Sequence, residues 1–363
     1  MKILILSGKF GMGHLSAATA LRAQMLAKFP DAQVQLCDIV EQLMPQRSGA
    51  LYQAFGAMVR HAKFLYNAYY TCNDKLPQTC KSAVVRLFLR PFHQLVQACC
   101  PDVILSALPF GAQLTSLYKQ VYGAQMCAVT CITDVSAHSE WIAPHTDLYL
   151  VPAAEVKWAL MRKKIPSDKI QVSGIPVGAR FRTACPHAPR ADKHLLVSGG
   201  GLCLLPQKGT AFYETLSHAP HVSVTVLTGT NRALYDTLQG RWANIHPVGF
   251  TNRVDVYMHD ADLLLSKPGG ITLFESMYAG VPMLVCHPEL GQEKKNARFI
   301  ERHGIGRVLW RRPADLAGIT LALLEDSAQL ERMRRNITAV RGGLHADVTA
   351  AIARQLQVRE MAQ

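Results

Sequence analysis

The sequence predicts an α/β fold with two parallel β-sheets, for three reasons. Short apolar runs of strand length alternate with helical patterns along the whole chain. The 363 residues exceed the usual size of a single hydrophobic core. A stretch with three prolines and no periodicity, residues 174–193, separates two similar series of runs. We therefore predict one domain over residues 1–190, with this connection at its end, a second domain over 191–345, and a C-terminal helix over 346–363.

The predicted strands are the apolar, β-branched runs, and the amphipathic segments between them are the predicted helices. Runs of this kind are typical of parallel sheets that helices cover on both faces. In the first half they are KILIL (2–6), VQLCDIV (34–40), PDVILSAL (101–108), QMCAVTCIT (125–133) and LYLVP (148–152). In the second half they are HLLVSGG (194–200), VSVTVLTG (222–229), ADLLLS (261–266) and VPMLVC (281–286).

The last segment of the chain has helical spacing, with apolar residues at Val348, Ile352, Leu356 and Val358. This spacing predicts a helix that packs back on one of the two domains.

The composition indicates a folded globular protein with a strong positive charge. The formal net charge of +13 and the pI near 9.4 favour polyanionic partners such as nucleic acid, anionic lipid or a phosphorylated substrate. The N-terminal apolar segment is too short for a secretion signal, and no apolar run approaches the roughly 20 residues of a spanning helix, so we predict a cytoplasmic protein. The ten cysteines form no CxxC pair, which disfavours a zinc site or a disulfide framework.

The first predicted strand ends in a glycine-rich turn that opens a helix. In an open parallel sheet, ligands bind at the carboxyl ends of the strands, where helix N-termini offer unpaired N–H groups. Gly8, Gly11 and Gly13 suit a loop that lies close to a ligand, and His14 can accept a proton at neutral pH. Alternatively, the glycines only make a tight turn and His14 packs. A dinucleotide-binding turn with Asp38 as the ribose acid fits less well, because the spacing is GxxGxG rather than GxGxxG.

The stretch ADLLLSKPGGITLFESMYAGVPMLV in the second half predicts a strand, a turn, a short helix and another strand. The turn at residues 267–270 opens the helix, so that the first N–H groups can converge on a diphosphate. Glu275, about one turn further, has a carboxylate suited to two ribose hydroxyls. Lys267 either neutralises phosphate or anchors the loop. The predicted donor-binding residues of this stretch are Lys267, Gly269, Gly270, Ile271, Thr272 and Glu275.

Two further segments of the second half follow predicted strand ends. SGGG (198–201) permits another close backbone approach at Gly199 and Gly200. Gln292, Glu293 and Asn296, in GQEKKNA, carry polar groups that suit sugar hydroxyls. The alternative for this second segment is a charged, solvated helix start.

Taken together, these motifs resemble the processive diacylglycerol glycosyltransferases and the plant-type monogalactosyldiacylglycerol synthases. These families are related to the enzyme that adds N-acetylglucosamine in peptidoglycan synthesis. The resemblance runs from residue 1 to about residue 345, through ITDVSAHSEWIAPHTDLYLVPAAEV, VSGIPVGARF, SKPGGITLFES and GQEKKNA in that order. It implies a GT-B fold, in which two Rossmann-like domains face each other and the second holds most of a nucleotide sugar.

The resemblance also implies roles for individual residues. Residues 269–272 would contact phosphate, Glu275 the ribose, and Gln292 with Glu293 the sugar, while Phe250 would lie where the family holds the uracil ring. His14, after Gly13, matches a proposed catalytic base, and His138 with Trp141 matches a His-x-x-Trp element that we place on the acceptor side of the cleft. The sequence departs from the family's common GGGH at residues 11–14, and it has Lys294-Lys295 where acidic residues are frequent.

The reaction that this predicts is inverting glycosyl transfer to an acceptor hydroxyl, with His14 as general base. Asp134, after the strand AVTCIT, is an alternative base or an orienting partner. No DxD-like motif stands in a suitable loop, so the scheme needs neither a metal nor a cofactor, and the UDP-sugar is a substrate.

The segment between the second and third strands predicts a helix at a membrane surface. Residues 47–90 hold seven basic residues and one acidic residue, a net charge of six, and are unusually aromatic. Residues 51, 55, 58, 65 and 69 can share one apolar helical face flanked by basic side chains, as in interfacial helices. The alternative is a helix buried in the domain. The predicted membrane residues are Phe55, Arg60, Lys63 and Tyr69.

We therefore expect a transferase that moves a hexose from a UDP-sugar to diacylglycerol or a related lipid, at the inner face of the cell membrane. Two enzyme alternatives keep the same fold: a UDP-GlcNAc transferase with a polyprenyl-linked acceptor, and a UDP-sugar epimerase. A non-enzyme alternative is a basic nucleic-acid-binding protein. It is disfavoured because no basic stripe with stacking aromatics lies outside residues 47–90.

Overall fold

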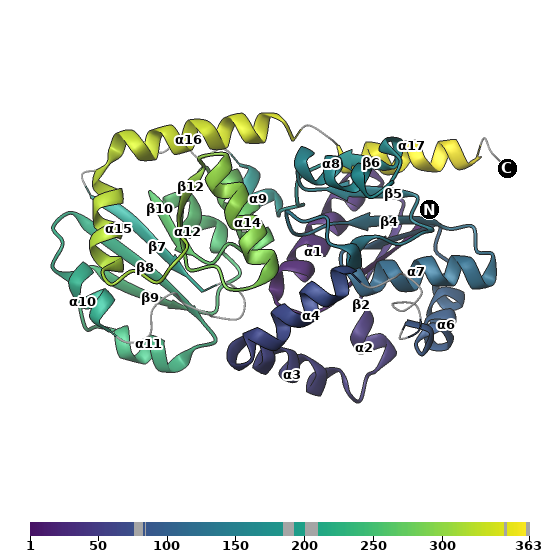
Figure 1. The fold of residues 1–363 in the computed structure, drawn as a ribbon, viewed down its shortest axis with the longest axis horizontal. Coiled ribbons are helices and arrows are strands. Elements are labelled where there is room, and N and C mark those ends of the chain that lie inside the picture. The colour runs from purple at the N-terminus through teal and green to yellow at the C-terminus, as the bar shows by residue number, and fades with distance from the viewer. Residues whose placement is uncertain (76–82, 84, 184–191, 200–209, 345–346, 361–363) are drawn as a thin grey trace. The chain divides into compact units, whose positions relative to one another are not determined.

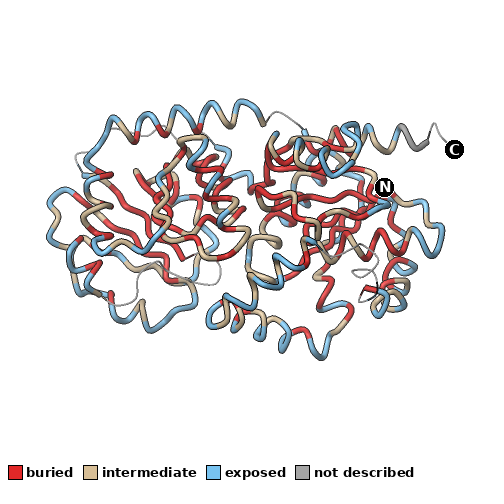
Figure 2. The backbone as a smooth tube through the Cα atoms, viewed as in Figure 1, coloured by how far each residue is buried: buried red, intermediate tan, exposed pale blue. Residues whose placement is uncertain are grey.

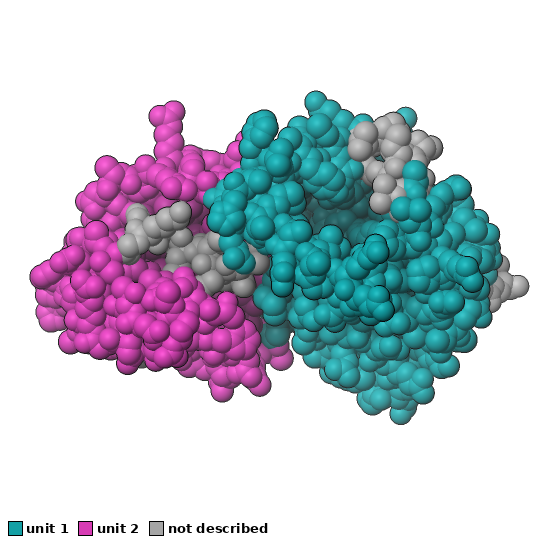
Figure 3. Space-filling model, turned by 90° about the horizontal axis from the view of Figure 1, so that it is seen from below, with its two compact units in different colours: residues 1–178, 344–363 teal, residues 179–343 magenta. Residues whose placement is uncertain are grey.

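The computed structural model of this chain describes residues 1–75, 83, 85–183, 192–199, 210–344 and 347–360. The chain forms two compact units, one of residues 1–178 and 344–363, the other of residues 179–343 (Figure 3). The division at residues 178 and 179 falls inside the connection predicted from its prolines, ahead of the boundary placed near residue 190. The C-terminal segment belongs to the first unit.

Each unit is an α/β domain around a six-stranded parallel sheet, which confirms the predicted fold class (Figure 1). In unit 1 the strand order is β2-β1-β3-β4-β5-β6, and neighbouring strands run parallel. The strands are β1 (Lys2–Ser7), β2 (Gln33–Asp38), β3 (Val103–Ser106), β4 (Cys127–Cys131), β5 (Leu148–Val151) and β6 (Ile170–Val172). Every predicted strand of the first half is present, and β6 is an additional edge strand.

The helices of unit 1 lie on both faces of this sheet. Alternate residues of each strand point to opposite faces, so Ile3 and Ile5 pack against α1 and α17, whereas Leu4 and Leu6 pack against α2, α6 and α7. The helices are α1 (Met12–Lys28), α2 (Ile39–Leu43), α3 (Ser48–His61), α4 (Lys63–Lys75), α6 (Leu89–Cys99), α7 (Pro109–Tyr122), η1 (Ser139–Trp141), α8 (Ala154–Arg162), η2 (Ser167–Lys169) and α17 (Val348–Glu360).

Unit 2 repeats this plan with the strand order β12-β11-β10-β7-β8-β9, again all parallel. The strands are β7 (Lys193–Ser198), β8 (Val222–Gly229), β9 (Ile245–Gly249), β10 (Leu263–Ser266), β11 (Met283–Cys286) and β12 (Gly306–Leu309). The helices are α9 (Ala179–Arg182), α10 (Ala211–Ser217), α11 (Arg232–Leu238), α12 (Val254–Asp260), α13 (Gly270–Ala279), α14 (Gly291–Arg302), α15 (Leu316–Glu325) and α16 (Ser327–Gly342).

In both units the central strands are buried along most of their length, and the outer faces of the helices are exposed (Figure 2). This pattern is expected for parallel sheets covered on both sides. The predicted C-terminal helix is confirmed as α17. Val348 and Ile352 lie in the core of unit 1, which decides between the two domains that the sequence left open.

The segment predicted as one helical face over residues 51–69 is two helices. Helix α3 ends at His61, Ala62 adopts a non-helical conformation, and α4 begins at Lys63. The apolar residues that spacing alone put on one face are therefore divided between two helices with different surroundings. Among the described residues, no helix combines the length and hydropathy needed to cross a membrane.

Candidate functional site

The sequence-predicted residues form two clusters, one in each unit, at the carboxyl ends of the parallel strands. In unit 1 the loops after β1, β3 and β4 meet, because these strands are neighbours in the sheet. The turn after β1 includes Gly11 as the N-cap of α1, with a φ of 77°, a conformation that favours glycine. His14 lies in the first turn of α1.

The imidazole of His14 is held by two groups from the neighbouring loops. Its Nδ1 lies 2.9 Å from the carbonyl oxygen of Ala107, just after β3, and 2.9 Å from the Oγ1 of Thr133, just after β4. A carbonyl oxygen can only accept, so Nδ1 carries the proton and Nε2 keeps its lone pair in the neutral ring.

The protonation equilibrium of His14 favours the same state. Burial lowers the pKa of this half-buried imidazole to about 4, although the Ala107 carbonyl raises it. The ring is therefore neutral at pH 7, and its Nε2 is chemically able to take a proton.

The sequence predicts Asp134 as a base or as an orienting partner of His14. In the structure, other groups make the contacts that orient His14. Nδ1 of His14 is bonded to Ala107 and Thr133 rather than to the carboxylate of Asp134. Asp134 follows Thr133 directly and is partly buried. Sequence patterns did not identify Ala107 or Thr133, because their proximity depends on the strand order β1-β3-β4. A role for Asp134 as a base stays a prediction.

The two residues of the His-x-x-Trp element lie in different surroundings. Trp141 is 3% exposed, and its ring centroid is 6.1 Å from that of His14. His138 is 1% exposed, and both of its ring nitrogens are engaged: Nε2 is 2.8 Å from the carbonyl oxygen of Tyr70, and Nδ1 accepts from the N–H of Glu140 at 3.3 Å. Trp141 is thus beside the candidate base, whereas His138 is part of the packing behind it.

In unit 2 the turn after β10 opens helix α13 as predicted. Gly269 is the N-cap, and the first N–H groups of α13 have no acceptor within the helix. Among the described residues, a Cβ added at Gly269 would meet nothing closer than the Oγ1 of Thr272 at 3.6 Å. The described residues therefore leave room beside this helix start, and the N-terminal N–H groups of Gly270, Ile271 and Thr272 form a suitable site for an anion.

Helix α14 holds this turn in place. The amide of Asn296, fully buried, donates to the carbonyl of Pro268 at 2.8 Å. Glu293, in the first turn of α14, accepts from the N–H groups of Glu289 and Leu290 and pairs with Lys267 at 3.4 Å. The structure thus supports the loop-anchoring alternative for Lys267. The contact of Glu293 with a sugar stays a prediction.

Two polar side chains near the turn, those of Gln292 and Glu275, are candidates for contacts with a ligand. The Oε1 of Gln292 is buried and has no hydrogen-bond partner among the described residues. Burial raises the pKa of Glu275 to about 8, so the ligand-free carboxyl group is mostly protonated at pH 7. Buried polar groups of this kind are costly unless a ligand completes their hydrogen bonds.

The remaining donor-side residues are placed as follows. Phe250, after β9, is 74% exposed, and Gly199 follows the end of β7. Gly13 lies in the first turn of α1, next to His14. Gly200 lies outside the described residues.

The residues predicted to meet a membrane are divided between α3 and α4. Phe55 packs edge-on against Phe10 at 5.0 Å and is only half-exposed, so it faces the protein. Arg60 is exposed and Lys63 is half-exposed, as is typical of basic side chains. Tyr69 is 56% exposed, but its hydroxyl donates to Glu140. The most exposed apolar side chain of helices α3 and α4 is that of Phe64, which is 81% exposed. The sequence pattern did not select this residue.

Among the described residues, no group of three or more His, Cys, Asp or Glu side chains is arranged to hold a metal ion. The expectation that the site works without a metal is not tested by this.

Comparison with known proteins gives matches over both units. Residues 14–177 match the family model for monogalactosyldiacylglycerol (MGDG) synthase, and residues 207–346 match the glycosyltransferase family 28 C-terminal domain. A processive diacylglycerol β-glucosyltransferase of Bacillus subtilis is 27% identical over 349 residues, which cover 93% of this chain and 90% of the relative.

Solved structures with the same fold cover the whole chain. The spinosyn rhamnosyltransferase SpnG matches with a TM-score of 0.63 and 16% identity, over 98% of this chain and all of the other. MurG of Acinetobacter baumannii matches with a TM-score of 0.62 and 14% identity, over 99% of both chains. At these identities the likeness concerns the fold, which is the two-domain GT-B arrangement of glycosyltransferases.

Proposed function

We propose that this chain transfers a hexose from a UDP-sugar to a membrane lipid, diacylglycerol in particular, because it matches the MGDG synthase model and processive diacylglycerol glucosyltransferases. These matches support a glycosyltransferase acting on a lipid. The proposal goes beyond these similarities where it names the donor nucleotide, the hexose and the lipid.

The observation that carries the donor assignment is the open N-terminus of α13. The N–H groups of Gly270, Ile271 and Thr272 would bind the diphosphate, and Glu275 would bind the ribose hydroxyls. The unsatisfied Oε1 of Gln292 would accept from a sugar hydroxyl. Phe250 would flank the uracil ring.

The chemistry follows from the state of His14. The acceptor hydroxyl attacks the anomeric carbon, the bond from that carbon to the diphosphate oxygen breaks, and the hydroxyl proton passes to Nε2 of His14. UDP leaves with its charge stabilised by helix N–H groups. The neutral ring, with Nδ1–H held by the Ala107 carbonyl, supplies the lone pair that this step needs.

The lipid acceptor is consistent with the surface of α3 and α4. Exposed apolar side chains at Phe64 and Leu65 lie beside basic residues in a chain of net charge +13. Each basic residue near an anionic leaflet contributes about 1 kcal/mol, so several together permit reversible binding. We place the protein peripherally at the inner face of the cell membrane, and we do not propose nucleic acid as a partner.

The test is incubation of the purified protein with diacylglycerol vesicles and UDP-glucose, UDP-galactose or UDP-GlcNAc in turn, followed by mass measurement of the lipids. The proposal expects diacylglycerol that carries one or more hexoses with one of the first two donors. Interconversion of UDP-sugars without any lipid would indicate the epimerase alternative. Transfer from UDP-GlcNAc only to a polyprenyl-linked acceptor would indicate the other enzyme alternative, a UDP-GlcNAc transferase.

A further inference from the structure

A short segment after β4 carries Trp141, and one side chain clamps it on both sides. Nε2 of Gln113, in α7, donates to the carbonyl oxygen of Glu140 at 2.9 Å and to that of Ile142 at 2.7 Å. These carbonyls belong to the residues immediately before and after Trp141. Both protons of one amide nitrogen are thus used to fix the position of a single residue. We refer to residues 138–142 as the 138–142 strap.

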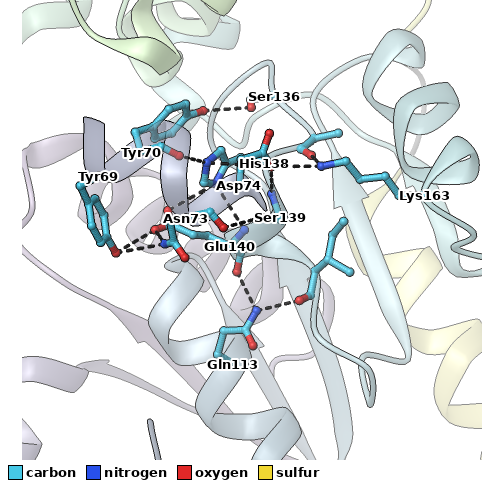
Figure 4. A network of polar contacts seen from close by, with 12 residues as sticks. Tyr69, Tyr70, Asn73, Asp74, Gln113, Ser136, His138, Ser139, Glu140 and Lys163 are labelled. Carbon is cyan, nitrogen blue, oxygen red and sulfur yellow. Dashed lines mark hydrogen bonds and ion pairs between the residues drawn. The ribbon is translucent and has the colours of Figure 1, made fainter. Parts of the chain in front are cut away.

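The other end of the strap is fixed to α4 by a network of polar contacts (Figure 4). His138 stacks on Tyr70 with ring centroids 3.9 Å apart, and its Nε2 donates to the Tyr70 carbonyl. Asp74 accepts from the N–H of Ser139 at 2.8 Å and from Lys163 at 3.1 Å.

The carboxylate of Asp74 stays charged at neutral pH. Burial raises the pKa of Asp74, but the Ser139 N–H and Lys163 outweigh this effect and hold the value at about 2. Asn73 and Tyr69, also from α4, bond the carboxylate of Glu140. All three residues immediately before Trp141 therefore have side chains bonded to α4, and Ser139 is bonded to it through its backbone N–H as well.

What the strap presents to the candidate base is the buried indole of Trp141. Within the described part of the chain, the imidazole of His14 is hydrogen-bonded through Nδ1 alone, so packing against the ring contributes to the position of Nε2. Trp141, at 6.1 Å between centroids and with its rings inclined by 53°, is the aromatic side chain in that place. Aromatic pairs at such separations have a preferred geometry.

We propose that the 138–142 strap orients the His14 base through Trp141, and that Gln113 and His138 are positioning residues for the transfer step. The inference rests on the proposed function, since it assigns these residues to the same reaction. Neither residue touches the reacting atoms in this scheme. A base displaced by about 1 Å can cost on the order of 100-fold in rate, so loss of the clamp is expected to appear in kcat.

The test compares Gln113→Met and His138→Phe with the wild-type enzyme in the vesicle transfer assay. Methionine keeps the length of Gln113 without its donors, and phenylalanine keeps the stacking of His138 without its hydrogen bonds. We expect kcat to fall about 10- to 100-fold in each, with the UDP-sugar KM and the affinity for UDP within twofold of wild type. His138→Gln, whose amide can both donate to Tyr70 and accept from Glu140, is expected to recover most of the lost kcat.

The matched control is Asp147→Asn, which removes a 2.5 Å ion pair with Lys119 elsewhere in unit 1. It is expected to lower the melting temperature while leaving kcat per folded molecule unchanged. The proposal is overturned if folded Gln113→Met and His138→Phe retain wild-type kcat, or if His138→Gln is as impaired as His138→Phe.

If the clamp variants do not fold, Trp141→Leu measured in the same way is the substitute, and wild-type kcat in that variant also overturns the proposal. A wild-type enzyme that binds UDP but transfers no sugar to any lipid would instead refute the proposed function. The two failures are therefore distinct.

Discussion

Burial leaves two ionisable residues of the candidate site, His14 and Glu275, uncharged at neutral pH. It lowers the pKa of His14 to about 4 and raises that of Glu275 to about 8. A neutral imidazole can act as a base, and a protonated carboxyl group can both donate to and accept from ribose hydroxyls. The same physical cause thus gives each residue the protonation state that its proposed role needs.

Glu275 makes the stability of unit 2 dependent on pH. Its pKa in the folded state exceeds the usual value of 4.5, so the folded state binds more protons between pH 4.5 and 8, and stability falls as pH rises through this window. We expect the melting temperature of the wild type to fall from pH 6 to pH 8.5, and Glu275→Gln to reduce this slope. Each 1 kcal/mol corresponds to roughly 2–4 °C in a domain of this size. Equal slopes in calorimetry of both proteins would contradict the assignment.

A substitution at Gly269 is expected to change donor binding without changing stability. Its φ of −65° is available to any residue and a Cβ fits within the chain, so Gly269→Ala should melt like the wild type. The added methyl group would stand over the N–H groups of α13, and we expect UDP affinity to fall about tenfold or more, which corresponds to at least 1.4 kcal/mol.

The control at the other end of the helix is Gly280→Ala. Gly280 has a φ of 77°, so alanine there is expected to destabilise the protein by about 1 kcal/mol while UDP affinity is retained. Unchanged UDP affinity in Gly269→Ala, measured by calorimetry, would place the donor elsewhere.

At the scale of elements, α3 and α4 have an inner face fixed to the protein and an outer face exposed. On the inner face Tyr52 accepts from the N–H of Lys9, Phe55 packs on Phe10, and Tyr70 stacks on His138. On the outer face Phe64 and Leu65 are 81% and 60% exposed. The buried-helix alternative raised from the sequence thus holds for the inner face, and the lipid-facing alternative stays a prediction for the exposed outer face.

This outer face gives a prediction on membrane binding. Phe64→Ser with Leu65→Ser should weaken binding to anionic vesicles roughly tenfold for each side chain, because each buried apolar side chain contributes about 1.5–3 kcal/mol. Trp158→Ser on α8, with a side chain of 59% exposure, is the control. Sedimentation with vesicles measures both. Equal losses in the two variants would contradict the specific role of α4.

The sequence identified all the central strands but only one of the four edge strands, β2. The nine predicted runs are all strands, whereas β6, β9 and β12 were missed, and all three are edge strands. They are short and only partly buried, and β9 contains Pro247, so they lack the continuous apolar pattern of a central strand. The break at Ala62 was missed for a different reason, because the apolar spacing continues across it.

For the candidate site, the residues at strand ends were predictable and their partners were not. Glycine-rich turns after strands pointed to His14 and to the start of α13. The contacts of His14 with Ala107 and Thr133, and that of Asn296 with Pro268, join segments far apart in sequence. Such contacts follow from strand order and helix packing, which local patterns do not contain.

At the scale of the whole molecule, the chain returns to its first unit at its end. Helix α17 places Ile352, which is fully buried, in the core of unit 1. Ile352→Ala is expected to destabilise unit 1 by about 2–5 kcal/mol and to leave UDP binding by unit 2 unchanged. Leu330→Ala, in the core of unit 2, is the matched control that should impair UDP binding when unit 2 unfolds. Denaturant titration with UDP binding as a probe measures both, and the opposite pattern would contradict the division into units.

The central claim is that unit 2 holds the nucleotide sugar while His14 of unit 1 removes the acceptor proton. The most direct measurement compares wild type and His14→Ala for single-turnover transfer to diacylglycerol vesicles and for UDP affinity. We predict transfer slowed by about 10²- to 10⁴-fold, with UDP affinity within twofold of the wild type. Transfer at the wild-type rate by the His14→Ala variant would contradict the claim.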